Sequence, residues 1–376
     1  MVEQLTPVNQ QPIGNASIKV IGVGGGGQNA VNRMYRERVE GVDYIAINTD
    51  AQALENAHLP DDKKLRVGDE TARGLGVGGD PARGRQCHEE SREEIKQILN
   101  GGDLVFVAAG MGGGTGSGGA PIVAEIAQEL ECLTVGVVTK PFSFEGKIRS
   151  KKAAEGIEQL TQHVDTMVII PNDRLMAVAD ETLTMNGAFE MADDVLAQGI
   201  QSIAELILIP GEINLDFADV RAIMENAGPA WMAIGKGTGE DRAVKAAEEA
   251  INSPLLEVEI TGAKGVIFNI TGGSDLTLEE VQKASEVISS TVHPDAHIIF
   301  GNVIDPKMEN EVKITVIATG FPKQEELDRI DRDSDKEILQ DPTKMGIPPF
   351  LRMHPSARRR TRNEISSSNQ LGMEFN

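Results

Sequence analysis

The sequence predicts an α/β fold: a doubly wound, mostly parallel sheet, a long central helix, a smaller second α/β domain with a mixed sheet, and a disordered C-terminal tail. Apolar strand candidates alternate with amphipathic helix candidates over residues 18–171. Several strand candidates are nearly continuous runs of Val and Ile, as expected for parallel strands covered on both faces. The composition agrees, because 40 glycines and only 3% aromatic residues in 376 imply an aliphatic core and many loops.

Five short apolar segments are the strand candidates of the first domain. They are residues 18–23, 44–48, 104–109, 133–139 and 167–170. Helix candidates in the connections include residues 28–39 and 83–99. A long helix is expected over residues 186–207, where apolar residues recur near helical spacing, and Pro210-Gly211 ends it.

The second domain begins near Asn214. Its last two strands, residues 296–302 and 312–318, are expected to form an antiparallel pair, because the turn between them is too short for a crossover. After Gly320 the amino-acid composition of the chain changes. Residues 322–343 contain eight acidic and four basic residues and few apolar ones, which predicts a solvated linker.

Charge and cysteine content narrow the function classes. The net charge of −22 and the pI near 4.7 argue against nucleic acid as a partner, since phosphate contacts need a basic face. Cys87 and Cys132 form no disulfide or metal pattern, which fits a reduced cytosol, and helix packing is the favoured role of Cys87 and the adjoining His88. The polar first 17 residues predict no secretory signal, and no apolar stretch is long enough to span a membrane.

The glycine cluster at residues 112–118 has five glycines in seven positions. It follows a strand candidate and precedes a helix that we expect to open at Ala120-Pro121, with proline in its first turn. Glycine is costly in backbone entropy, and a merely tight turn would need only one or two. Strand, glycine loop and helix N-terminus together predict a phosphate site.

A second glycine cluster follows the first strand candidate and contains G-x-G-x-x-G at Gly22, Gly24 and Gly27. Alone, this motif also suits a dinucleotide-binding site, with Asp50 placed for a ribose hydroxyl. That alternative needs one glycine loop, whereas a third glycine-rich segment lies at residues 74–80. Three such loops favour a nucleoside triphosphate enclosed on several sides, and there is no P-loop motif.

The segment GGGTGSG at residues 112–118 resembles the signature of the tubulin/FtsZ family, and further motifs resemble its bacterial cell-division GTPases. They are GVGGGGQNAVN (22–32), AINTD (46–50), PFSFEGKIR (141–149), PND (171–173), GEINLDFAD (211–219) and GEDR (239–242). The resemblance covers roughly residues 15–320 and a C-terminal peptide. It implies a GTP-binding, GTP-hydrolysing cytoskeletal protein that polymerises head-to-tail into the filaments of the division ring, in the cytoplasm beneath the membrane.

The resemblance also implies the nucleotide contacts. The two main glycine loops would hold the phosphates and residues 74–80 would sense the γ-phosphate. Glu145 and Arg149 would contact ribose and phosphate. Asn172, Phe189 and Asp193 would hold guanine, whose N1–H and amine suit a carboxylate acceptor; from the residues alone, Phe189 equally suits helix packing. The full set is Gly24, Gly25, Gly26, Gly27, Asn29, Asn48, Asp50, Gly76, Gly110, Met111, Gly112, Gly113, Gly114, Thr115, Gly116, Ser117, Gly118, Pro141, Glu145, Arg149, Asn172, Phe189 and Asp193.

Asn214, Asp216 and Asp219 have a spacing that by itself suits a helix N-cap. The resemblance implies instead that they face the GTP of a neighbouring subunit, polarise the attacking water and help to place a cation. It implies Mg²⁺ with the phosphates and a monovalent cation at the interface. A head-to-tail contact builds an open filament, so hydrolysis would be coupled to assembly. Arg149 is the nearest candidate for an arginine finger.

The tail completes the resemblance. Ile347, Pro348, Phe350, Leu351 and Arg352 resemble the family's C-terminal peptide, which docks on membrane tethers and regulators; the second proline, Pro349, departs from the pattern. The basic run at residues 358–362 suits anionic lipid at about 1 kcal/mol per charge, or a solvated tail. The expected divisions are a flexible N-terminus (1–16), a GTP-binding domain (17–183), a central helix (184–210), a C-terminal activation domain (211–320), an acidic linker (321–344) and a docking peptide with basic tail (345–376).

Overall fold

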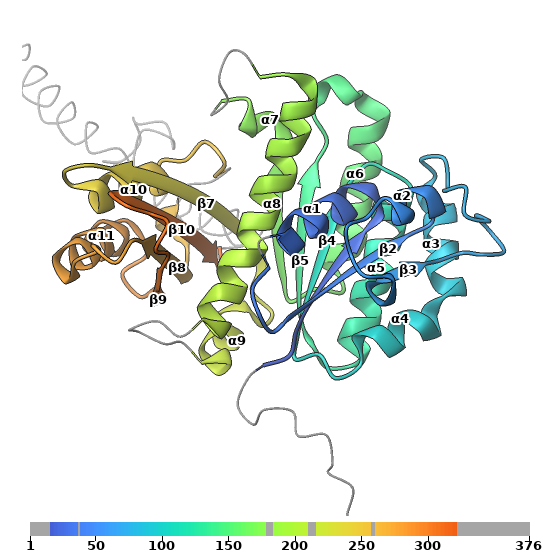
Figure 1. Cartoon of the computed structure of the whole chain (residues 1–376), viewed down its shortest axis with the longest axis horizontal. Helices are drawn as coiled ribbons and strands as arrows, with labels where there is room; N and C mark the ends of the chain where they lie inside the picture. The colour runs from blue at the N-terminus through green and yellow to red at the C-terminus, as the bar shows by residue number, and fades with distance from the viewer. Residues whose placement is uncertain (1–15, 37, 178–182, 210–215, 257–259, 322–376) are drawn as a thin grey trace, which may run out of the picture. The chain divides into compact units, whose positions relative to one another are not determined.

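The structure is a computed structural model that describes residues 16–36, 38–177, 183–209, 216–256 and 260–321 (Figure 1). The strands of this part form one sheet in the order β3-β2-β1-β4-β5-β6-β7-β10-β8-β9. They are β1 (Ile18–Val23), β2 (Val42–Asn48), β3 (Lys64–Arg66), β4 (Leu104–Gly110), β5 (Leu133–Lys140), β6 (Thr166–Pro171), β7 (Gly228–Thr238), β8 (Gly265–Gly272), β9 (His297–Ile304) and β10 (Glu311–Thr319). All pairs from β3 to β7 are parallel, as predicted.

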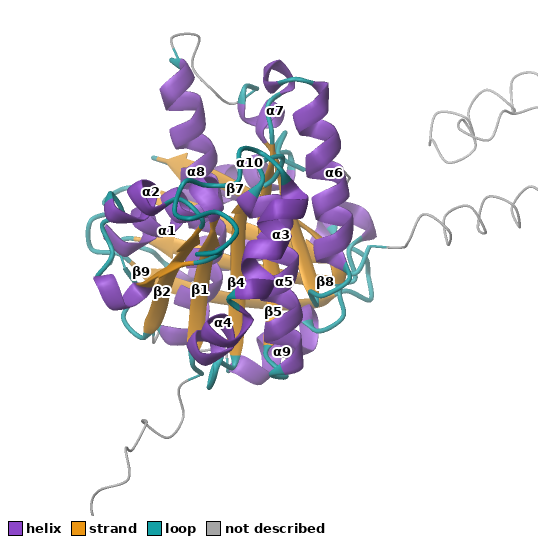
Figure 2. Cartoon of the chain, turned by 90° about the vertical axis from the view of Figure 1, so that its right-hand side faces the viewer, coloured by secondary structure: helices purple, strands orange, loops and turns teal. Residues whose placement is uncertain are grey.

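Helices cover both faces of the parallel half of the sheet. They and the helices of the C-terminal part are α1 (Gly24–Arg36), α2 (Ala51–Glu55), α3 (Pro81–Glu90), α4 (Arg92–Leu99), α5 (Thr115–Glu129), α6 (Lys147–Thr161), α7 (Asn172–Leu175), α8 (Met185–Leu208), α9 (Phe217–Met224), α10 (Arg242–Ile251) and α11 (Leu278–Thr291). Ile18 and Val20 of β1 pack with α1 and α8, whereas Ile21 and Val23 pack on the other face with α3 to α6 (Figure 2). Both faces are therefore apolar, which explains the continuous Val and Ile runs.

The register of the strands aligns their carboxyl ends. Val23 of β1 pairs with Ala109, one residue before the end of β4. Gly110 pairs with Thr139, and Lys140 pairs with Pro171, the last residue of β6. The chain proceeds from β1 to β2 in one direction and from β4 to β6 in the other, so the switch point lies between β1 and β4. Ligands of doubly wound sheets bind in the crevice at this point.

Strand β7 joins the two halves of the sheet. It pairs in parallel with β6 and antiparallel with β10. The prediction that the last two strands pair with each other is wrong, because β8 lies between them: it pairs in parallel with β9 and antiparallel with β10. The central place buries β10 from Ile314 to Thr319, whereas a position beside β9 would leave β10 at the edge of the sheet.

The predicted single helix over residues 83–99 is two helices, α3 and α4, which meet at Ser91. The backbone of Ser91 leaves the helical region, with φ −104° and ψ 25°. Its hydroxyl accepts a hydrogen bond from the N–H of Gly68, at 3.3 Å. The break is thus tied to a contact that is distant in sequence and invisible to a local helical pattern.

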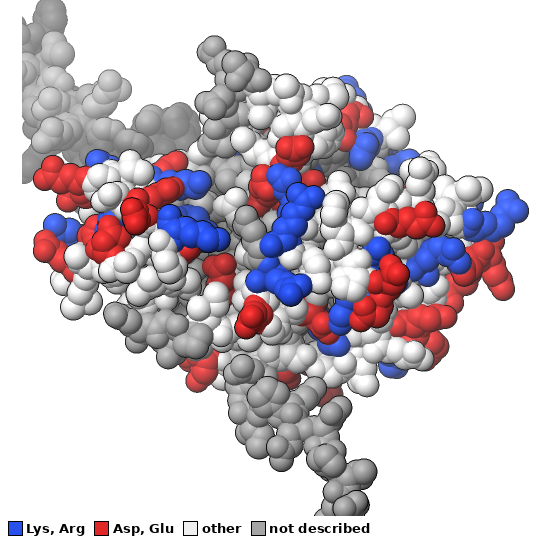
Figure 3. Space-filling model, viewed as in Figure 1, with Lys and Arg blue, Asp and Glu red and all other residues white. Residues whose placement is uncertain are grey.

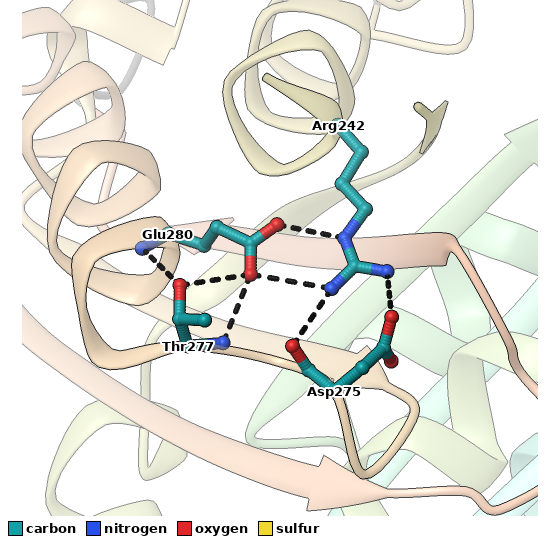
Figure 4. A network of polar contacts seen from close by, with 4 residues as sticks. All are labelled: Arg242, Asp275, Thr277 and Glu280. Atoms are coloured by element: carbon teal, nitrogen blue, oxygen red, sulfur yellow. Dashed lines mark hydrogen bonds and ion pairs between the residues drawn. The ribbon is translucent and has the colours of Figure 1, made fainter. Parts of the chain in front are cut away.

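A polar cluster holds the C-terminal part of the fold (Figure 4). Arg242, the first residue of α10, donates from Nε to Glu280 at 2.7 Å and from Nη1 to Asp275 at 2.6 Å. Glu280 also caps the start of α11 with Thr277. The hydrogen bond from Arg242 lowers the pKa of Glu280 to about 2. The arginine of the GEDR motif therefore joins the starts of α10 and α11.

Candidate nucleotide site

Two helices begin side by side at the carboxyl edge of the sheet. Helix α1 starts at Gly24, directly after β1, and α5 starts at Thr115, shortly after β4. Gly24 has φ +70°, and a Cβ on it would lie 2.9 Å from the backbone nitrogen of Gly116. The two helix starts are thus in contact. Their free N–H groups and the positive ends of their dipoles make a place for an anion.

The glycines of the 112–118 cluster divide into two roles. The expectation that the helix opens at Pro121 is wrong, because α5 already starts at Thr115 and Pro121 lies within it. A Cβ on Gly116 would lie 2.7 Å from the carbonyl oxygen of Gly110, and one on Gly118 would lie 2.1 Å from that of Pro81. These glycines permit close packing. By contrast, a Cβ on Gly113, like one on Gly25 of the first cluster, would meet no atom within 4 Å.

Several predicted site residues hold the glycine loops through hydrogen bonds or are buried beneath them. Ser117 accepts a hydrogen bond from the N–H of Gly112 at 2.7 Å, and the hydroxyls of Thr115 and Thr49 lie 2.7 Å apart. Asn48 is buried and donates to a side chain of α1. The Met111 side chain is likewise buried, in the apolar core. These contacts fix the loops in place before any ligand binds.

The third glycine segment, residues 74–80, forms a loop over the start of α5. Its glycines at 74, 76, 78 and 79 all have positive φ. Gly76 donates to the carbonyl of Thr49 at 3.1 Å, and Asp50 forms a bridge with Leu75. Asp50 also caps α2, accepting from the N–H of Ala53 at 3.1 Å. At the other end of the loop, a Cβ on Gly114 would lie 2.7 Å from the nitrogen of Asp80, so the two glycine loops meet there.

Glu145 and Arg149 lie where β5 leads into α6. Glu145 is nearly buried, accepts from the N–H of Phe142 at 2.8 Å and pairs with Arg149 at 3.1 Å. The Arg149 side chain is half exposed and crosses Gly112, where a Cβ would lie 2.7 Å from its Cγ. Pro141, the residue after β5, leads into this turn. The ion pair therefore lies beside the 112–118 loop, and its contacts with ribose and phosphate stay a prediction.

The residues expected to hold guanine come from α7 and α8. Asn172, directly after β6, is buried, and its Oδ1 has no hydrogen-bond partner among the described residues. Leu175 of α7 packs against Ala192 of α8, beside Asp193. Phe189 is 38% exposed and contacts the edge of Phe142, with ring centroids 5.5 Å apart. An unpaired buried amide oxygen is costly, so it marks a place for a donor from a ligand.

Asp193 has a strongly perturbed carboxyl group. Burial raises its pKa to about 7, and the opposing effects of Arg33 and a hydrogen bond from Asn29 do not cancel this. It lines a cavity of about 380 Å³ together with Asn29, Arg33 and Glu190. A carboxyl group poised near neutrality in a cavity is typical of a functional site.

Sequence reasoning missed Arg33. Its guanidinium pairs with both oxygens of Asp194, with 2.8 Å from Nη2 to Oδ2, and links α1 to α8 beside Asp193. The sequence gives no local signal for this pair, because its members are 161 residues apart in the chain. The helix packing predicted for His88 is confirmed: its buried ring lies against Gly119 of α5, Nδ1 bonds the carbonyl of Gly84 at 2.8 Å, and burial lowers its pKa to about 4.

Asp216 and Asp219 lie at the start of α9. Asp216 caps the helix, accepting from the N–H of Asp219 at 2.9 Å, and both residues are exposed. Helix α9 ends beside the amino end of β6, where the hydroxyl of Thr166 donates to the carbonyl of Met224. Asn214, the peptide at 347–352 and the basic run at 358–362 lie outside the described residues.

The acids and the glycine loops lie at opposite ends of the molecule. Helix α8 has 24 residues and is therefore about 36 Å long. Asp193 is the ninth residue of α8, about 22 Å along the axis from its end, and lies at the carboxyl edge of the sheet, whereas α9 follows that end at the amino edge. Within one chain, Asp216 cannot reach a nucleotide held by Asp193.

A larger cavity, of about 770 Å³, lies away from the glycine loops, between α8 and the C-terminal strands. Basic side chains, including Arg36, Arg38, Lys236 and Lys313, line it, and Figure 3 shows such residues near the centre of this face. It has no part in the nucleotide site. The helices of the described residues include none with the length and apolar character needed to cross a bilayer.

Comparison with known proteins agrees with this geometry. Residues 17–180 match the GTPase domain of the tubulin/FtsZ family, and residues 228–322 match the FtsZ family C-terminal domain. An empty FtsZ dimer from M. jannaschii is 46% identical, covering 81% of this chain and 88% of that chain, with a TM-score of 0.79. CetZ1 from Haloferax volcanii, solved as a GDP-bound monomer, shares the fold with a TM-score of 0.71. It is 21% identical, and the match covers 82% of this chain and 95% of that chain. CetZ2 from the same organism, solved as a GTPγS-bound protofilament, also shares the fold, with a TM-score of 0.69. It is 19% identical, and the match covers 86% of this chain and 99% of that chain. The chain belongs to the tubulin/FtsZ family of GTPases, in its FtsZ branch.

Proposed function

We propose that this GTPase binds GTP at the carboxyl edge of its sheet and hydrolyses it only when a second copy completes the site. Head-to-tail stacking then produces filaments, which form the division ring. The observation that carries the proposal is that Asp216 and Asp219 lie at the amino edge of the sheet, whereas the glycine loops lie at its carboxyl edge, with about 22 Å of α8 between Asp193 and the end of that helix. A heterologous contact of this kind builds an open filament.

Exposed apolar side chains support an interface at the nucleotide end. Six of the nine large apolar residues that are exposed in the described part of the chain belong to elements at this end. They are Leu75, Phe144, Ile148, Met176, Met185 and Phe189. Apolar side chains gathered around a polar site are typical of a surface that another protein covers.

In the proposed complex, the starts of α1 and α5 hold the phosphates and the 74–80 loop senses the γ-phosphate. Glu145 and Arg149 contact ribose and phosphate. Asn172 and Asp193 form hydrogen bonds with guanine, and Phe189 stacks on it. The alternative of a dinucleotide site loses its support, because the chain belongs to the tubulin/FtsZ family of GTPases.

For hydrolysis, Asp216 and Asp219 of the next subunit accept hydrogen bonds from the attacking water and orient it toward the γ-phosphate. The N–H groups at the helix starts stabilise the charge that develops on the phosphate oxygens. The described residues contain no group of three metal-ligating side chains, so Mg²⁺ and a monovalent cation would be held by the phosphates together with the neighbour's acids. Such cations would neutralise phosphate charge.

The remaining parts of the proposal concern the tail. The peptide at 347–352 docks on membrane tethers and regulators, and the basic run at 358–362 adds contact with anionic lipid. Together they place the filament in the cytoplasm, under the membrane at the division site. The domain boundaries given above remain predictions.

The test is phosphate release from GTP across a protein dilution series, with light scattering on the same samples. We expect activity per molecule to appear together with scattering above a critical concentration, because each site needs two chains. A rate per molecule that stays constant on dilution would contradict the shared site.

A further inference from the structure

The tip of the 74–80 loop is Gly78-Gly79, which is exposed, whereas Val77 before it is buried in the apolar core. Gly78 and Gly79 both have positive φ, and a Cβ on either would meet no atom within 4 Å. The base of the loop is fixed by backbone bonds to Thr49 and Ala51, and its end by Asp80, which caps α3. Between these anchors lie two consecutive glycines in open space, so the backbone there can reorient at little cost.

One side chain from another element reaches this tip within the described part of the chain. Lys152 of α6 donates from Nζ to the carbonyl oxygen of Gly79 at 2.6 Å. A hydrogen bond from an ammonium group is stronger than one between neutral groups. Lys152 is partly buried, whereas the adjacent Lys151 is exposed and forms an ion pair with Glu155, at 3.8 Å.

The face of α6 that carries Lys152 follows the phosphate loop. Three residues earlier, Arg149 crosses Gly112; four residues later, Gly156 packs on Ser117, where a Cβ would lie 2.9 Å from the Ser117 side chain. Residues three and four apart share one face of a helix. Lys152 therefore stands over the place where the 74–80 loop meets the 112–118 cluster.

We infer that Lys152 is a positioning residue that holds the tip of the 74–80 loop over the phosphate loop and thereby sets the preference for triphosphate over diphosphate. The inference rests on the proposed function, in which this loop senses the γ-phosphate. A loose tip has to be ordered when a triphosphate binds, and this ordering costs entropy. Lys152 orders the tip before the nucleotide binds, which lowers this cost for a triphosphate. A diphosphate has no γ-phosphate for the tip to contact, so its affinity does not depend on Lys152.

The first experiment needs no nucleotide. Hydrogen exchange of the free protein is compared for the unchanged chain, Lys152→Met, Lys152→Arg and Lys151→Met. The amide of Asp80, bonded to the carbonyl of Val77 at the tip, should exchange about fivefold faster or more in Lys152→Met only. Lys152→Arg keeps a cationic donor and should restore slow exchange. Equal exchange rates of the Asp80 amide in Lys152→Met and Lys151→Met would overturn this role of Lys152.

The second experiment measures dissociation constants for GDP and for GTPγS with the same four proteins, at concentrations below assembly. Lys152→Met should weaken GTPγS about fivefold to tenfold and leave GDP within about twofold. Lys152→Arg should restore most of the difference, and Lys151→Met should change neither constant. Because Lys151→Met removes the same charge from the adjacent position, a loss seen in Lys152→Met alone separates positioning from a general loss of positive charge.

The outcomes distinguish this inference from the function on which it rests. If the unchanged chain binds neither nucleotide, the proposed function and the role of Lys152 both fail. If it binds both and Lys152→Met weakens them equally, or weakens neither, the role of Lys152 alone is overturned.

Discussion

Two polar regions of this molecule differ in how completely their groups are paired. At the carboxyl edge of the sheet, the buried Oδ1 of Asn172 has no partner among the residues that the structure describes, and burial raises the pKa of Asp193 to about 7. In the C-terminal part, Arg242 donates to both Asp275 and Glu280, and the pKa of Glu280 is lowered to about 2. Each region includes one residue of a quoted sequence motif, Asn172 of PND and Arg242 of GEDR.

We interpret the contrast as the difference between a site that a ligand completes and a cluster that stabilises the fold. Paired charges favour the ionised carboxylate, whereas desolvation without sufficient pairing favours the neutral acid. The first region is incompletely satisfied in the isolated chain, which suits a site that is completed by nucleotide. The second is satisfied within the chain and leaves nothing for a partner to complete.

The largest expected effect comes from a residue outside both regions. Asp216→Ala should reduce GTP turnover by about a hundredfold or more, because a group that orients the attacking water is lost. GTP affinity should stay within about twofold, since α8 separates Asp216 from the nucleotide of its own chain. Turnover and equilibrium binding are measured on the same preparation. Loss of binding would show that Asp216 has only a structural role.

Breaking the paired region should affect stability and leave binding intact. Arg242→Met leaves Glu280 and Asp275 without their cation and should lower the free energy of unfolding by about 2 kcal/mol, less than for a fully buried pair because Asp275 is half exposed. Denaturant unfolding measures this, with exposed Lys245→Met on the same helix as the control. An unchanged midpoint for Arg242→Met, or a loss of guanine affinity without loss of stability, would remove the distinction between the regions.

The smallest expected effect is a pH dependence at the unpaired region. Asp193 must be ionised to accept the N1–H and amine of guanine, and its pKa in the free chain is raised to about 7. Below that pH the carboxyl group is protonated, so the affinity for GDP should fall by about tenfold for each pH unit. Calorimetry between pH 6 and 8 measures it, and Asp193→Asn should abolish the dependence. A constant affinity in unmodified protein would mean that Asp193 does not contact the base.

Much of the parallel half of the fold could be predicted from the sequence. The strand Ile18–Val23 has the predicted bounds, because its apolar run is local and both faces are buried. The position of the glycine clusters at the carboxyl edge of the sheet could also be predicted, from the order of strands and helices alone. The tubulin/FtsZ family membership is confirmed, since its motifs are short and contiguous.

What could not be predicted depends on contacts between distant segments. The insertion of β10 between β7 and β8 is decided by burial in the assembled sheet, which the short turn before β10 does not reveal. The start of α5 at Thr115 depends on Gly116 and Gly118 fitting against other backbones. The pairing of Arg33 with Asp194 joins helices 161 residues apart in the chain.

The shared active site is tested most directly by mixing two inactive variants. Asp216→Ala keeps the nucleotide end intact, and Asp193→Ala keeps the acids of α9 intact. In randomly mixed filaments, about a quarter of the interfaces join a sound nucleotide end to sound acids, so the mixture should recover about that fraction of normal GTP turnover. Sedimentation of the same samples establishes that both variants assemble together. Mixed filaments with no more activity than the two variants measured separately would contradict a site shared between subunits.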